Sequence, residues 1–158
     1  MKLKKRFGSI TKNMQDRRPL VVDVNVVISA LMHKGDSLEV FLQNFVKEKF
    51  DFISPYFLLI ELSKYTEKIM KKTKLSSEEL LEMTNFVMNQ IILIRDIEFS
   101  DKVEEAKEIL KEHYKDSPYL ALALARNCNL FSGDKTLKSL YPERIKNPKE
   151  ILYKLDNY

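Results

Sequence analysis

The sequence has little of what most cofactor and disulfide sites require. Its 158 residues include three glycines, one cysteine and two histidines. Three scattered glycines cannot form a dinucleotide-binding fingerprint or a phosphate-binding loop, and they exclude a G-x-S-x-G nucleophile elbow. The cysteine and histidine counts exclude an internal disulfide and leave no conventional zinc site. What remains plentiful is carboxylate chemistry, with 23 Asp and Glu residues.

Long hydrophobic runs are also absent. The longest nearly apolar stretch, residues 20–32, is interrupted by Asp23 and Asn25, whereas a membrane span needs roughly 18–20 apolar residues. The first residues are charged but lack the apolar segment of a secretory signal. We therefore expect a cytoplasmic protein whose length suits one compact domain.

The net charge of +4 is unevenly distributed. Residues 1–18 contain seven Lys or Arg and one Asp, so the remaining chain is slightly acidic. We expect a basic N-terminal arm over residues 1–18 and a folded domain over residues 19–158. Such an arm suits contacts with nucleic-acid phosphates, and a solvated leader is the plainer interpretation.

Short apolar segments alternate with helical periodicity along the domain. Strands are predicted at residues 20–22, 50–53, 91–94 and 130–131, with helices between these four and a fifth strand from 145. In the helix that begins at Asp36, the three- and four-residue spacing of apolar residues predicts an inward face of Leu38, Phe41, Leu42, Phe45 and Val46. The alternation predicts a three-layer α/β/α sandwich with a mostly parallel sheet of four to five strands.

Four carboxylates stand out in this arrangement, because ligands of parallel sheets collect beyond the carboxyl ends of the strands. Asp23 directly follows the first strand, and Asp134 follows the fourth. Glu61 interrupts an apolar helical turn. Asp116 opens the helix that leads into the fourth strand, and this order alone predicts the opposite rim of the sheet. Helix capping, turn formation and surface ion pairing are the plainer explanations for these acids.

Brought together, the four acids predict a Mg²⁺ or Mn²⁺ site. These ions prefer oxygen ligands, and a cation relieves the repulsion between crowded carboxylates. Such an ion polarises a phosphoryl oxygen and supplies hydroxide for in-line attack. Asn25 and Ser132, which flank two of the acids, are expected to orient a carboxylate or a bound water.

The residues around these acids resemble the PIN-domain nucleases. The likeness lies in residues 21–27, in Ser54-Pro55 followed by Glu61, in residues 116–123 and in residues 131–135, and it extends over about residues 19–155. Family likeness implies that Asp116 shares the rim of the other three acids. It also implies hydrolysis of single-stranded RNA at one Mg²⁺ or Mn²⁺ site.

Many relatives are VapC-type toxins, so the resemblance also implies a homodimer and an antitoxin protein partner. We expect Lys64, Lys68 and Lys135, which follow Glu61 and Asp134, to bind the phosphate backbone of the RNA. A solvated helix face is the plainer interpretation of the lysines. The alternative for the whole chain is a catalytically inactive PIN-like module that binds RNA or protein.

Overall fold

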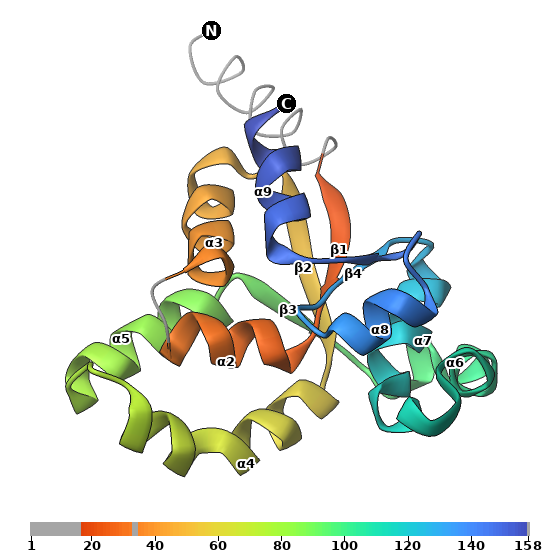
Figure 1. Cartoon of the computed structure of the whole chain (residues 1–158), viewed down its shortest axis with the longest axis horizontal. Helices are drawn as coiled ribbons and strands as arrows, with labels where there is room; N and C mark the ends of the chain where they lie inside the picture. Colours follow the sequence, from red (N-terminus) through yellow and green to blue (C-terminus); the bar gives the residue numbers. More distant parts are fainter. Residues whose placement is uncertain (1–16, 33–34, 158) are drawn as a thin grey trace, which may run out of the picture.

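A five-stranded parallel sheet forms the centre of the molecule in the computed structural model, which describes residues 17–32 and 35–157. The strand order is β3-β2-β1-β4-β5, and every neighbouring pair is parallel (Figure 1). The strands are β1 (Arg18–Val22), β2 (Phe50–Pro55), β3 (Ile91–Ile94), β4 (Asn129–Phe131) and β5 (Ile145–Lys146). All five carboxyl ends therefore meet at one rim, and the predicted parallel α/β sandwich is confirmed.

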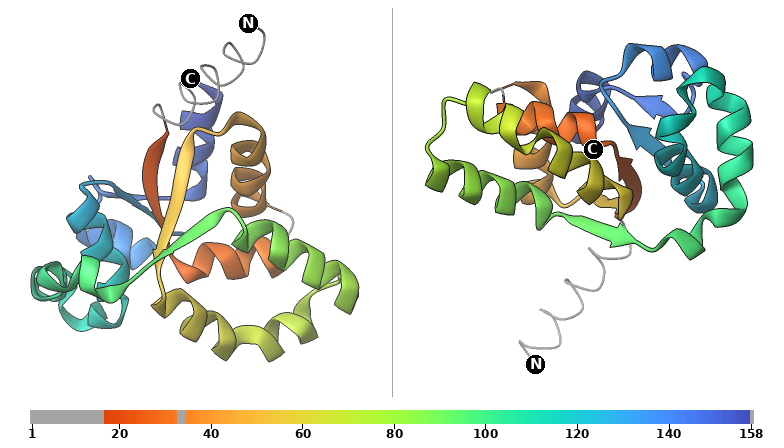
Figure 2. Two further views of the ribbon diagram at one scale, coloured as in Figure 1. Left: turned by 180° about the vertical axis from the view of Figure 1, so that it is seen from behind. Right: turned by 90° about the horizontal axis from the view of Figure 1, so that it is seen from below.

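Helices cover both faces of the sheet. They are α2 (Val24–Met32), α3 (Asp36–Lys47), α4 (Phe57–Lys72), α5 (Ser77–Met88), α6 (Val103–Leu110), α7 (Ser117–Arg126), α8 (Lys135–Leu140) and α9 (Pro148–Asp156). Short 3₁₀ helices η1 (Asp96–Glu98), η2 (Ser100–Lys102) and η3 (Lys111–Asp116) surround α6. Helix α7 packs on β1 and β2 with α6 outside it, while α3 and α9 lie together on the other face (Figure 2). No helix in the described ranges is long and apolar enough to cross a bilayer.

Local sequence signals account for most of these elements. Leu20, Val21 and Val22 of β1 are at most 1% exposed, as expected for a central strand that is covered on both faces. A serine three residues before a glutamate is the sequence signature of a capping box, and α5 begins with one, since Ser76 and Glu79 each accept a hydrogen bond from the other's backbone N–H at 3.2 Å. Helix α8 was not predicted, because it has only six residues and Leu137 is its single buried residue.

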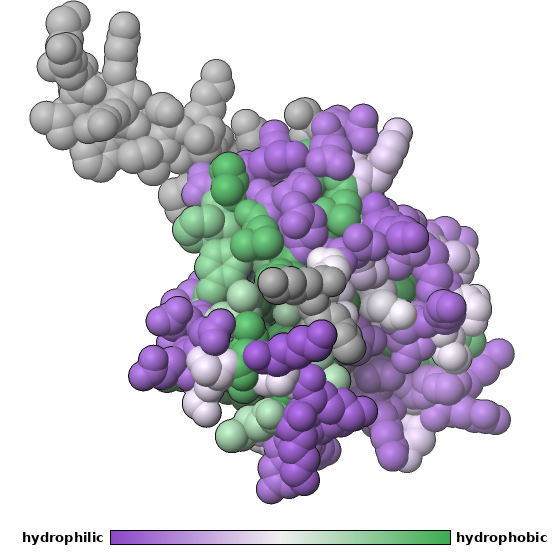
Figure 3. Space-filling view, turned by 60° about the vertical axis from the view of Figure 1, so that its left-hand side comes forward, coloured by the Kyte–Doolittle hydropathy of each residue, from purple (hydrophilic) through white to green (hydrophobic). Residues whose placement is uncertain are grey.

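The predicted inward face of α3 is largely wrong. Phe41 is buried, but Leu42, Phe45 and Val46 are 42%, 61% and 78% exposed. The helix buries Asn44 instead, whose side-chain amide donates to the carbonyl of Phe50 and accepts from its N–H at 3.0 and 2.9 Å. Leu38 packs partly buried against the core, as predicted. With Asn44 on the buried face, Leu42, Phe45 and Val46 are directed outward. Hydrophobic residues gather on this side of the molecule in Figure 3.

The expected basic arm lies mostly outside the described residues. Its last two residues are described, and Arg18 begins β1. The guanidinium of Arg17 pairs with Glu48 at 2.9 Å and with Asp51 at 3.5 Å. These two residues therefore belong to the folded part of the chain.

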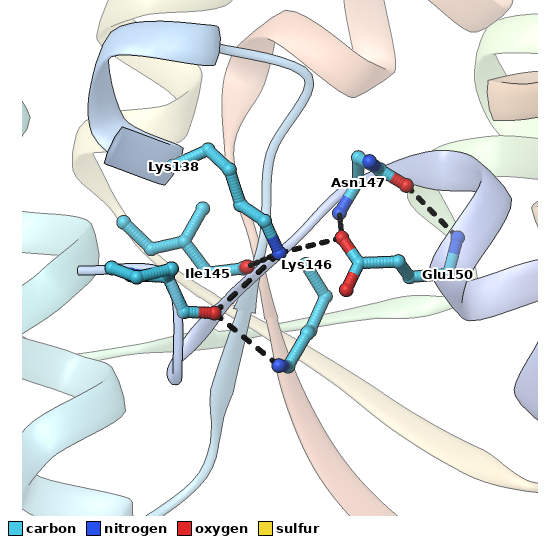
Figure 4. Close-up of polar contacts among 6 residues, drawn as sticks. Lys138, Ile145, Lys146, Asn147 and Glu150 are labelled. Carbon is cyan, nitrogen blue, oxygen red and sulfur yellow. Dashed lines mark hydrogen bonds and ion pairs between the residues drawn. The ribbon is translucent and has the colours of Figure 1, made fainter. Parts of the chain in front are cut away.

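Lys138 connects α8 to the last strand and helix. Its Nζ donates to the carbonyl of Ile145 at 2.8 Å and to Oε1 of Glu150 at 2.6 Å (Figure 4). Glu150 and Asn147 form the capping box that begins α9. Partial burial alone would raise the pKa of the Glu150 carboxyl, but the hydrogen bonds from Lys138 and Asn147 hold it below its usual 4.5.

Replacing Lys138 by Met is expected to lower the free energy of unfolding by about 1–2 kcal/mol, because the Ile145 carbonyl and the Glu150 carboxylate both lose a donor. Urea denaturation at pH 7 measures the change. The exposed Lys149 is the matched control, and Lys149→Met should leave stability unchanged within about 0.5 kcal/mol. Equal effects of the two substitutions would show that Lys138 does not hold this junction.

Candidate metal centre

Asp23 lies at the carboxyl end of the central strand β1, where the chain turns into α2. Its side chain is buried, with 2% of the residue exposed. Oδ1 accepts a hydrogen bond from the N–H of Asn25 at 3.2 Å, and Oδ2 accepts one from the hydroxyl of Ser132 at 2.9 Å. The N–H of Asp23 donates to the carbonyl of Phe131 at 3.0 Å. The carboxylate is therefore held in place from both β1 and β4.

Asn25, in the first turn of α2, and Ser132, just after β4, connect the segments that follow these two strands. The amide of Asn25 donates to the Ser132 hydroxyl oxygen and accepts from the N–H of Gly133, both at 3.1 Å. The same hydroxyl oxygen accepts from the N–H of Asp134 at 3.1 Å. Asn25 and Ser132 therefore make the contacts expected of residues that orient the Asp23 carboxylate. Their orienting role stays a prediction.

Asp134 begins the short helix α8. Its Oδ1 accepts hydrogen bonds from the N–H groups of Thr136 and Leu137 at 2.8 and 3.1 Å, so the turn and capping explanation holds for this oxygen. No described residue donates to its Oδ2 at hydrogen-bond distance, and this second oxygen is therefore available to a ligand.

Asp116 directly precedes α7, but its side chain makes no capping hydrogen bond. The expectation from chain order, that it lies at the opposite rim, is wrong. Helix α7 runs antiparallel to the strands, because it leads into the amino end of β4, so its first residue starts at the carboxyl rim. The negative charge of Asp116 accordingly acts on the buried Asp23.

Glu61 completes the group from α4, where its side chain is half-buried. Its charge acts on Asp116 and on the hydroxyl of Tyr119. Asp134 acts on both Asp23 and Asp116. Four acids from four different segments therefore carry charge in a common region at the carboxyl rim of the sheet.

Burial and mutual repulsion both favour the neutral form of these acids. Burial, followed by the charge of Asp116, raises the pKa of Asp23 from 3.8 to about 7, although Ser132 and Asn25 act in the opposite direction. Burial and the charges of Asp134 and Glu61 raise the pKa of Asp116. Among the described side chains, no Lys or Arg forms an ion pair with any of the four acids. An external cation would therefore relieve this repulsion.

The donor set suits an oxygen-ligated cation that keeps much of its water. All four side chains offer carboxylate oxygens, which Mg²⁺ and Mn²⁺ prefer. Within residues 17–32 and 35–157, no three His, Cys, Asp or Glu side chains are arranged so that they could hold one metal ion. Mg²⁺ often binds through one or two carboxylates, with waters completing its shell. The residues fit that kind of binding and do not form an all-protein cage.

Tyr119 is a further residue of this region that the sequence did not single out. Its hydroxyl is buried and has no hydrogen bond of good geometry to a described group, although the Val24 N–H lies near it. Burial and the charges of Asp23 and Glu61 raise the pKa of Tyr119. The signal in the sequence was a tyrosine three residues after Asp116, in an otherwise aliphatic helix. A neutral hydroxyl among carboxylates suits a donor to one of them or to a bound water.

The predicted substrate lysines lie at the surface around these acids. Lys64 and Lys68 are exposed on α4, where they line a shallow hollow of about 430 Å³ with Glu67, Lys71 and Lys72. Lys135 is the exposed first residue of α8. None of these three lysines forms an ion pair with a described acid.

Fold and site together define an α/β protein with a carboxylate cluster at the carboxyl rim of its sheet. A family model described as PIN domain matches residues 21–145, and the chain belongs to the PIN-domain family. PIN domains are generally nucleases and typically use divalent metals. The predicted family membership is thereby confirmed.

Solved structures of similar fold include PAE2754 from Pyrobaculum aerophilum, which is 14% identical with a TM-score of 0.64 over 90% of this chain and 92% of that chain. VapBC2 from Rickettsia felis, bound to a DNA fragment from its promoter, is 14% identical with a TM-score of 0.59. That match covers 82% of this chain and 98% of the other. At this identity the likeness shows the fold alone. None of the curated proteins matches significantly.

Proposed function

We propose that the protein is a Mg²⁺- or Mn²⁺-dependent endoribonuclease that cleaves single-stranded RNA, and that it is the toxin of a toxin–antitoxin pair. One observation carries the proposal: Asp23, Glu61, Asp116 and Asp134 share the carboxyl rim of the sheet, and no described cation pairs with them. Membership of a family of nucleases supports the reaction class. The fold shared with VapBC2 supports the biological role.

In this proposal one or two of the four carboxylates would hold the ion directly, with waters completing its shell, and the other acids would add negative charge. Asn25 and Ser132 would keep Asp23 in position. Once bound, the ion would supply a Lewis acid for the phosphodiester and lower the pKa of a coordinated water. The two hydrogen bonds fix the Asp23 carboxyl in place, so that it needs little reorganisation to accept a cation. The hydroxyl of Tyr119 would donate within this group and so gain the partner that it lacks among the described residues.

The test is cleavage of a fluorescently labelled single-stranded RNA by the purified protein. We expect cleavage with Mn²⁺ or Mg²⁺ and none in excess chelator, with activity restored when the metal is returned. If RNA is bound in a salt-sensitive manner but is cleaved under none of these conditions, the chain is the inactive binding module instead.

Lys64, Lys68 and Lys135 are proposed to contact the RNA backbone. Lys64 and Lys68 follow Glu61 by three and seven residues, so all three lie near one face of α4. Each is exposed, and its charge is not neutralised by a described acid, which suits a polyanionic ligand.

Changing both Lys64 and Lys68 to Gln is expected to weaken RNA binding about tenfold at low salt and to reduce the slope of log affinity against log salt by about 1.4, since each phosphate contact on a single strand contributes about 0.7. The effect should be the same for RNAs of different sequence. Fluorescence anisotropy over a salt series measures both quantities. The exposed Lys107 and Lys149 provide the control pair, and an equal change in that pair would contradict a specific role for the α4 lysines.

Two protein partners complete the proposal: an antitoxin and a second copy of the chain, in the cytoplasm. The outward face of α3, formed by Leu42, Phe45 and Val46, supports self-association, because exposed apolar patches commonly mark protein interfaces. The ring of Phe45 lies 5.2 Å from that of Phe86 on α5, so the apolar surface continues onto a second helix. Light scattering of the purified protein distinguishes a dimer from a monomer.

A further inference from the structure

A small hollow lies beside the acids, on the side of α4 and the 3₁₀ helices. It has a volume of about 230 Å³ and is formed by the start of α4, by η1 and η2, and by the start of α7. Phe57, Phe99 and Pro118 contribute apolar wall. Tyr56, which is 48% exposed, lies at its open side, and two polar residues, Asp96 and Ser100, also line it.

This hollow shares its wall with the acid group. The ring centroid of Phe57 lies 5.7 Å from that of Tyr119, and the charges of Asp23, Glu61 and Asp116 act on the Tyr119 hydroxyl. Pro118 follows Asp116 by two residues and lines the hollow directly. The residues that line the hollow therefore adjoin the residues around the acids.

The size of the hollow suits a single ring system. An apolar cavity of about 150 Å³ accepts benzene, whereas pockets for drug-sized ligands begin at about 300 Å³. A volume of about 230 Å³ lies between these limits, which is enough for one nucleobase and too little for a nucleotide with its sugar and phosphate. The exposed ring of Tyr56 offers the stacking surface on which unpaired bases bind.

A polar residue at the hollow, Asp96, favours guanine over uracil. The Asp96 carboxylate is exposed and forms no ion pair with a described side chain, so it is available as an acceptor. The Watson–Crick edge of guanine presents two adjacent N–H donors, which match the two oxygens of a carboxylate. Uracil presents a single N–H between two carbonyl oxygens, which a carboxylate repels.

We propose that this hollow binds one unpaired base of the RNA next to the phosphate at the acids, and that Asp96 makes it prefer guanine. The inference rests on the proposed function for its ligand, single-stranded RNA. It adds where one base of the RNA binds and which side chains give the protein its sequence preference. Tyr56 supplies stacking and Asp96 supplies hydrogen-bond selection, so both are specificity residues outside the acid group.

The experiment compares two RNAs, a short oligouridylate and the same RNA with one central guanosine. Binding is measured by fluorescence anisotropy with the Asp23→Asn protein, so that the RNA stays intact. We expect the guanosine RNA to bind about tenfold more tightly, which is the size of effect that hydrogen bonds to a charged acceptor give. Adding Tyr56→Ala or Asp96→Asn should reduce this preference below about twofold, whereas Tyr56→Phe should keep it because the ring remains.

Two matched controls separate this effect from a general loss of affinity. Tyr153 is 68% exposed on α9, and Asp101 is exposed on η2 outside the hollow. Tyr153→Ala and Asp101→Asn should leave the preference unchanged. Circular dichroism confirms that every variant is folded.

Cleavage mapping with the wild-type protein and Mn²⁺ distinguishes the two proposals. Both proposals are supported if the wild-type protein cleaves next to the guanosine and the Tyr56→Ala protein cleaves without this preference. Cleavage without a base preference, or with a preference that Tyr56→Ala and Asp96→Asn leave intact, overturns the base site and leaves the nuclease standing. Guanine-selective binding that depends on Tyr56 and Asp96, with no cleavage in any metal, supports the base site and overturns the nuclease.

Discussion

Asp23→Asn is expected to reduce metal-dependent RNA cleavage on the order of 100-fold or more while the protein remains folded. Asp23 is the most buried of the four acids and directly follows the central strand. Asn has the same shape but offers one neutral oxygen, so it loses the charge that would bind the cation. Steady-state cleavage of labelled RNA over a range of Mn²⁺ concentrations measures the loss.

Asp101→Asn is the matched control for this substitution, because Asp101 is exposed on η2 and outside the acid group. It should cleave at the wild-type rate. If Asp23→Asn also cleaves at the wild-type rate, the acids at the carboxyl rim are not the site of the reaction. A partial loss that excess Mn²⁺ restores would instead identify weakened metal binding as the main defect.

The strands and the overall layering could be predicted because they depend on local composition. Short apolar runs such as residues 20–22 specify buried strands. The rotation of α3 could not be predicted in this way. It depends on Asn44 bonding to the backbone of Phe50, a contact between elements that overrides the apolar pattern of the helix itself.

The candidate site shows the same division. Asp23 and Asp134 could be selected from the sequence, since each follows a strand and carboxyl strand ends share one rim. The position of Asp116 could not be predicted in this way, because it depends on the direction of α7, which runs back across the sheet before β4. Tyr119 gave no signal strong enough to distinguish it from a core aromatic. Its place near the acids arises only when α7 packs on β1 and β2 and α4 packs beside β2.

The second large effect is on stability: the metal-free protein should become less stable as the pH rises from about 4 to about 7. The unfolded chain has an ordinary Asp23 pKa near 3.8, whereas burial and Asp116 raise the folded value to about 7. Between these values the folded state holds a proton that the unfolded state releases, so raising the pH favours unfolding. The folded and unfolded pKa of Asp23 differ by about three, which corresponds to at most about 4 kcal/mol in the free energy of unfolding. Asp116, whose pKa is also raised, adds to the loss.

Urea denaturation in chelator between pH 5 and pH 8 measures this slope, in a range above the lowered pKa of Glu150. Asp23→Asn should flatten most of it, and at pH 8 the variant should be more stable than the parent. The substitution also removes the Asp23 acceptor from the Ser132 hydroxyl proton, while the hydroxyl oxygen already accepts from Asn25 and Asp134. The loss of this hydrogen bond should reduce the gain in stability at pH 8 by about 1 kcal/mol.

Adding Mn²⁺ at pH 8 should reverse the loss in the parent protein, because a ligand that binds only the folded state stabilises it by mass action. It should leave Asp23→Asn nearly unchanged. Stability of the parent that is flat or rising from pH 5 to pH 8 in chelator would mean that Asp23 is ionised in the folded state without a metal. The repulsion that we assign to the four acids would then be relieved by the protein alone, and they would have no electrostatic need for a cation.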